Sequence, residues 1–153
     1  MRNFIIVIIS LAALVLYGCS NTGKESLSGY SPPDVYIDVD NQKYKTKLGT
    51  YCWKGDCVDT FGPAELLKDK EPIQVEAGAT VTLEMNYNPR PNEVHLTRIV
   101  DNKESTVPIK DHQFKAPTEK GIYYYSYGVW WLDEKDKSMS HGDAFYAFVL
   151  GVK

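Results

Sequence analysis

The last third of the chain alternates strictly between its two faces over the segments "GIYYYSYGVWW" and "DAFYAFVLGV". Successive side chains of a strand point to opposite faces of a sheet, so a repeat of two is the pattern of a β-strand. One face of the first segment carries four large aromatic residues, Tyr123, Tyr125, Tyr127 and Trp131. The other face carries Tyr124 and Trp130, so we expect one face to enter the core and the other to look outward. Two long strands are therefore predicted, joined by the charged loop "LDEKDKSMSHG".

Shorter segments upstream follow the same repeat, with turn-forming residues between them. They read "VYIDV", "YKTKL", "TVTLEMNY", "VHLTRIV" and "STVPI". Asp40-Asn41 separates the first pair, and Asp101 to Glu104 separates the last pair, as expected of hairpins. Only "PAELLKDK" has a helical composition, with Pro63 suited to a first helical position. About eight short strands and one short helix predict an all-β fold, an antiparallel β-sandwich.

The amino terminus has the composition of a secretory signal. Arg2 supplies a positive charge, and residues 4–16 are apolar except for one serine, which is shorter than the roughly 20 residues of a membrane-spanning helix. The apolar run ends in Leu16-Tyr17-Gly18-Cys19. This ending resembles the lipobox of bacterial lipoproteins, with an aliphatic residue three positions before the cysteine and a small residue directly before it.

The lipoprotein resemblance implies both a cellular location and a covalent lipid anchor. It implies that residues 1–18 are cleaved and that the Cys19 thiol carries a diacylglyceryl group, which holds the protein on the outer, extracytoplasmic face of the cell membrane. Two acyl chains anchor firmly, because each buried methylene contributes about 0.8 kcal/mol. Residues 19–33 are polar, rich in serine and glycine and end in two prolines, so we expect a flexible linker. The remaining segment, 34–153, has the size of a single domain.

The charge balance argues against nucleic acid as a partner. The chain has 17 basic and 20 acidic side chains, a net charge of −3. Such a chain has no electrostatic attraction to phosphate backbones or to anionic bilayer surfaces. Contact with the membrane is therefore expected through the lipid on Cys19.

Part of the domain is similar to a known architecture. The segments "IQVEAGATVTLEM", "FKAPTEKGIYYYSY" and "FYAFVLGV" resemble immunoglobulin-like modules of Gram-positive surface lipoproteins. The resemblance covers about half of the chain and implies a sandwich, without fixing the order of strands. It does not extend to the immunoglobulin disulfide, which joins the two sheets across a long sequence interval.

The two cysteines downstream of the linker lie close together in "YCWKGDC". In an extracytoplasmic protein an isolated pair is expected to form a disulfide, here Cys52 to Cys57 across a tight hairpin. Redox-active or metal-binding thiols are the alternatives, although the spacing differs from that of thioredoxin-type motifs.

Catalytic patterns are not recognisable in the sequence. No nucleophile elbow, paired carboxylates, phosphate loop or calcium loop occurs, so we predict neither an enzyme nor a cofactor. Met139 and His141 are residue types that suit copper. An extracytoplasmic copper-handling or thiol-redox protein is therefore kept as the alternative function, without an assigned metal site.

Aromatic residues near the predicted disulfide supply the candidate binding surface. Tyr51, Trp53 and Trp131 are proposed to form it, since tyrosine and tryptophan dominate binding surfaces. We expect Trp53 to be partly exposed and Trp131 to be largely buried. The sequence thus predicts a lipid-anchored, non-enzymatic binding module of the cell envelope, with an envelope glycan or a protein as its partner.

Overall fold

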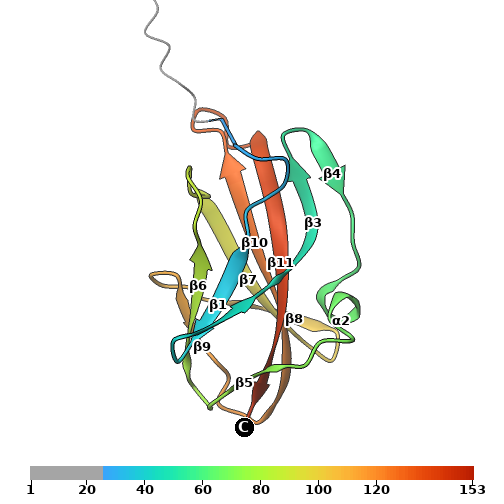
Figure 1. The fold of residues 1–153 in the computed structure, drawn as a ribbon, viewed down its shortest axis with the longest axis vertical. Coiled ribbons are helices and arrows are strands. Elements are labelled where there is room, and N and C mark those ends of the chain that lie inside the picture. The colour runs from blue at the N-terminus through green and yellow to red at the C-terminus, as the bar shows by residue number, and fades with distance from the viewer. Residues whose placement is uncertain (1–25) are drawn as a thin grey trace, which may run out of the picture.

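The computed structural model describes residues 26–153, which form two β-sheets packed face to face (Figure 1). One sheet has the strand order β2-β1-β6-β9, and the other has the order β4-β3-β11-β10-β7-β8. The fifth strand adds to the second sheet by pairing with β11 in parallel, and the other pairs are antiparallel. The predicted β-sandwich with one short helix is confirmed.

The elements follow one another along the chain as β1 (Val35–Val39), β2 (Gln42–Lys45), β3 (Lys47–Trp53), β4 (Asp56–Val58), α2 (Pro63–Leu66), β5 (Ile73–Val75), β6 (Thr80–Met85), β7 (Glu93–Val100), β8 (Lys103–Val107), β9 (Gln113–Lys115), β10 (Gly121–Leu132) and β11 (Ser140–Val152). No helix among residues 26–153 combines the length and apolar character needed to span a membrane.

The hairpin of β10 and β11 forms the centre of the larger sheet. The two strands stay in register from Gly121, opposite Val152, to Trp131, opposite Gly142, and an irregularity then places Leu132 opposite Ser140 next to the connecting loop. The aromatic face predicted for β10 points into the sandwich, where Tyr125 stacks on Phe148 at a ring distance of 4.8 Å. The smaller sheet covers this face with buried apolar side chains, Val35, Ile37, Val39, Val81, Leu83 and Phe114. Each fully buried side chain of this kind contributes roughly 1.5–3 kcal/mol.

Two of the predicted hairpins close through two-residue turns with left-handed backbone. The φ angles are 52° and 63° at Asp40 and Asn41, and 48° and 61° at Asp101 and Asn102. Positive φ at both central positions defines a type I′ turn, whose twist matches that of paired strands. Asparagine and aspartate tolerate this conformation, which explains how the sequence locates both turns.

The helix is shorter than its composition indicated. It comprises one turn, Pro63–Leu66, and the chain then leaves the helical path instead of continuing to Lys70. Gly62 precedes the helix and has no side chain that could accept a capping hydrogen bond. The helix therefore lacks the stabilisation that a side-chain cap would add. Leu67 is buried against Ala147 and Val149 on the outside of the larger sheet.

The predicted linker is packed onto the sandwich over its second half. Leu27 is only 6% exposed, and Pro32 is also buried. The described residues before β1 are therefore part of the folded domain, and the expectation of a free linker up to residue 33 is wrong for them. The signal peptide, the lipobox and Cys19 lie outside the described residues and stay predictions.

Candidate functional site

The hairpin of β3 and β4 is closed by a disulfide between Cys52 and Cys57. The two cysteines are directly opposite each other in the antiparallel register. Lys54 and Gly55, which connect the strands, both have positive φ. The predicted pairing is confirmed.

The predicted binding surface beside this hairpin is instead part of the core. Trp53 is 1% exposed and Trp131 is 4% exposed. Their rings meet edge to face with centroids 5.0 Å apart, and Tyr87 lies 5.7 Å from each. We refer to Trp53, Tyr87 and Trp131 as the inner cluster. The expectation of a partly exposed Trp53 is wrong, whereas the burial of Trp131 is confirmed.

The covering of Trp53 explains the error. Its indole N–H donates to the carbonyl of Gly29 at 3.4 Å, and the Trp131 N–H donates to the carbonyl of Pro89 at 2.7 Å. Both carbonyls belong to segments without regular structure that close over this end of the sandwich. Tyr51 is half-buried and packs against the same core, so these three residues do not form an open aromatic surface.

A second group of aromatic side chains lies on the opposite, outer face of the larger sheet. Trp130 packs edge to face against Phe145 of β11 and His95 of β7, with both centroid distances 5.3 Å. We refer to His95, Trp130 and Phe145 as the outer row. Gly128 pairs with both His95 and Phe145, and a Cβ at Gly128 would lie 2.6 Å from the Trp130 ring. The glycine thus makes room for the indole to fold back over the sheet between its two neighbours.

Carboxylates lie beside the outer row. Glu93 and Asp143 are the direct strand partners of Trp130. Glu93 forms a 2.8 Å contact with the His95 ring. Burial raises the pKa of the Asp143 carboxyl, and a hydrogen bond from the backbone of Cys52 acts in the opposite direction. The row therefore combines flat apolar rings with acceptors for ligand hydroxyl or ammonium groups.

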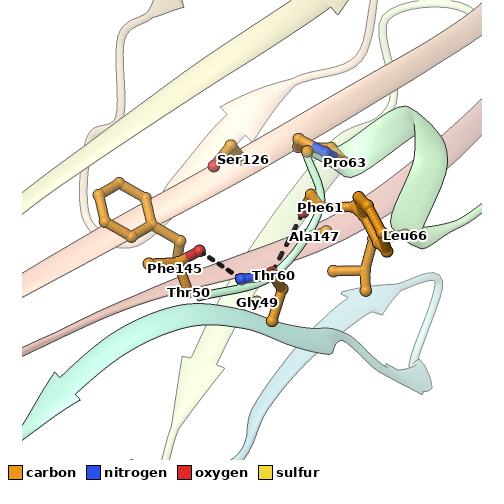
Figure 2. A pocket seen from close by; sticks show the side chains of 10 residues that line it. Gly49, Thr50, Thr60, Phe61, Pro63, Leu66, Ser126, Phe145 and Ala147 are labelled. Carbon is orange, nitrogen blue, oxygen red and sulfur yellow. Dashed lines mark hydrogen bonds between the residues drawn. The ribbon is translucent and has the colours of Figure 1, made fainter. Parts of the chain in front are cut away.

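A cavity of about 310 Å³ adjoins the row and shares Phe145 with it (Figure 2). It is lined by Gly49, Thr50, Thr60, Phe61, Gly62, Pro63, Leu66, Ser126, Phe145 and Ala147. The Thr60 amide donates to the Thr50 hydroxyl at 3.0 Å, which ties the segment after β4 to β3. Phe61 is 73% exposed. This volume is at the lower end for small-molecule sites, which start near ~300 Å³.

Of the residues named for copper, Met139 lies in the loop between β10 and β11, and His141 lies at the start of β11. His141 contacts the Asp133 carboxylate at 3.1 Å, and Met139 is exposed. Within residues 26–153, no three or more His, Cys, Asp or Glu side chains are grouped so that they could hold a metal ion. The copper hypothesis keeps only its two original candidate ligands.

Sequence reasoning located part of the outer row. The alternation of β10 assigned Trp130 to the face opposite Trp131, which is where it lies. His95 and Phe145 were missed, because only the pairing of β7 and β11 with β10 places them beside Trp130. The cavity was missed for the same reason, since its walls come from four separate parts of the chain.

Comparisons of the chain with models of protein families, with curated proteins and with solved structures found no significant match.

Proposed function

We propose that the protein is a lipid-anchored, non-enzymatic binding module of the cell envelope, and that its outer row and adjoining cavity bind an envelope glycan. The observation that carries the proposal is the partly exposed Trp130, held between His95 and Phe145 on the outside of the sheet. Packing of the core does not require aromatic side chains on the solvent-facing side of the larger sheet.

The chemistry of the surface fits a sugar better than a flat protein partner. Sugar rings present apolar C–H faces, which pack on aromatic rings, and hydroxyl edges, which need acceptors and donors. The rings of the outer row supply surfaces for the C–H faces. The carboxylates of Glu93 and Asp143 and the hydroxyls of Thr50 and Ser126 supply hydrogen-bonding partners for the hydroxyl edges. The cavity volume of about 310 Å³ suits one residue of a glycan better than a broad protein surface.

A cosedimentation assay with purified cell-wall glycan tests the binding surface. The protein is extracted from membranes in detergent and compared with Trp130→Ala and with Tyr30→Ala, which removes a fully exposed ring in the segment before β1. We expect Trp130→Ala to weaken binding by more than ~1 kcal/mol, and Tyr30→Ala to bind like the unmodified protein. Equal binding by all three proteins would contradict the proposed surface.

The anchor has its own test. Cys19→Ala is expected to abolish incorporation of a labelled fatty acid and to leave the protein either released or uncleaved. Normal cleavage after Gly18 together with unchanged membrane retention would show that Cys19 takes no part.

A further inference from the structure

The segment Leu27–Pro33, which we refer to as the strap, is fixed to one end of the sandwich. Leu27 inserts its side chain next to Trp53, over Gly142 of β11. A Cβ at Gly142 would lie 2.6 Å from Leu27 and 2.8 Å from the Trp53 ring. Only a glycine therefore leaves space for Leu27 at this position.

Hydrogen bonds hold the strap along its length. The Ser28 amide donates to the Tyr87 hydroxyl at 2.6 Å, and that hydroxyl donates back to the Ser28 carbonyl at 3.1 Å. The Gly29 carbonyl accepts from Trp53 and from Lys54. At the other end, the Tyr146 hydroxyl donates to the Pro33 carbonyl at 2.6 Å. The strap is thus bonded to the sandwich near both of its ends, through Ser28 and Gly29 and through Pro33.

The strap enters at the end of the sandwich that carries the β10–β11 loop and the disulfide hairpin (Figure 1). The carboxyl terminus and the start of β10 lie at the opposite end, because Gly121 pairs with Val152. β11 has 13 residues and therefore 12 steps, so the two ends of the hairpin are about 41 Å apart at ~3.4 Å per step.

The length of chain before the strap decides which end can reach a membrane. Leu27 follows Cys19 by eight residues, which span at most about 29 Å when fully extended. This reach is shorter than the sandwich, so the domain cannot stand inverted on the bilayer with its far end down. With the strap undocked, the free chain would run from Cys19 to Val35 and span up to about 58 Å, which is enough for the domain to turn over.

We propose that the strap orients the domain, with the disulfide hairpin and the β10–β11 loop facing the lipid bilayer and the carboxyl-terminal end facing away. This inference rests on the proposed lipid anchor at Cys19. Trp130 is two residues from the end of β10, so the outer row lies in the half of the domain nearer the membrane. Its ligand is then one that is presented within a few tens of ångströms of the bilayer.

Energy transfer to the membrane surface tests the orientation. The full protein is purified from membranes and reconstituted into phosphatidylethanolamine and phosphatidylglycerol vesicles with a headgroup-linked acceptor. A donor is attached to Lys137→Cys in the β10–β11 loop or to Lys120→Cys at the far end. Both lysines are exposed, and with Cys19 acylated and Cys52 bonded to Cys57 the new thiol is the only free one.

We expect transfer from position 137 to exceed transfer from position 120 several-fold. The difference should shrink strongly in Leu27→Ala/Tyr87→Phe, which loosens the strap and keeps the Tyr87 ring. The difference should also shrink when twelve glycine and serine residues are inserted after Asn21. This insertion leaves the strap itself intact, so it tests the orientation even if the double variant misfolds.

Equal transfer from the two positions in the unmodified protein would overturn the orientation, and so would a difference that persists in both variants. Failure of the anchor gives a distinct result. Mass spectrometry would then find no lipid on Cys19, and the protein would not remain with the vesicles.

Discussion

Trp130 and Trp131 are neighbours in the chain and lie in opposite environments. Trp131 is enclosed in the inner cluster with Trp53 and Tyr87, and its N–H has a backbone partner. Trp130 lies on the outside of the same sheet, where His95 and Phe145 hold its edges and solvent reaches part of the ring. Residue type alone therefore does not distinguish an aromatic side chain of the core from one that could bind a ligand. The difference is whether other parts of the protein cover its ring.

The largest difference is expected from removing each tryptophan in turn. Trp131→Ala leaves a cavity inside the inner cluster and should lower the free energy of unfolding by about 3–5 kcal/mol. Trp130→Ala removes a ring from a half-open face and should cost about 1 kcal/mol. Denaturant unfolding of both variants measures the contrast. Equal losses would mean that the outer row is as structural as the inner cluster.

Tyrosines buried inside the sandwich should make the stability of the protein depend on pH in the alkaline range. Burial raises the pKa of Tyr127 from 10.0 to about 12. Between these values the unfolded chain releases the proton and the folded chain keeps it, so stability is complete below about pH 10 and falls as pH rises toward 12. Tyr127→Phe should remove about 2–3 kcal/mol of this loss.

Unfolding curves from pH 8 to 12 check the expectation, with Tyr30→Phe at a fully exposed position as the matched control. The burial argument for Tyr127 would fail if both variants lost stability with pH as steeply as the unmodified protein.

The disulfide tests whether the inner cluster depends on its covalent neighbour. Cys52 precedes Trp53, and its bond to Cys57 closes a short loop, for which the chain-entropy model gives about 2 kcal/mol. Cys52→Ser/Cys57→Ser should lower stability by about this amount while the strap and sheets keep Trp53 enclosed. Near-ultraviolet circular dichroism reports on the ring packing, and loss of its tryptophan signal in the folded variant would show that the bond itself positions Trp53.

The sequence predicted those parts of the fold that depend on local pattern. The repeat of two gave the long strands, Asp40-Asn41 gave a turn, and the spacing of Cys52 and Cys57 gave the disulfide. It did not predict the burial of Trp53, because the cover comes from Leu27 and Gly29, in a segment whose composition is that of a linker.

The outer row shows the same limit. Trp130 was placed on its face by alternation alone, but His95 and Phe145 join it only through the order of strands in the sheet. That order depends on pairings between distant segments, for which a single sequence has no local signal. Gly128 is the one residue whose identity reflects the row, since any larger side chain would displace the Trp130 ring.

The smallest expected effect is optical. The chain has three tryptophans, and two of them, Trp53 and Trp131, are almost fully buried. Collisional quenching of tryptophan fluorescence by acrylamide should therefore come mainly from Trp130. Trp130→Phe keeps an aromatic ring over Gly128, so we expect the fold to persist and most of the quenching to disappear. Trp53→Phe is the matched control and should leave the quenching nearly unchanged. If quenching fell equally in both variants, the inner cluster would be open to solvent, and the contrast between the two faces of β10 would not hold.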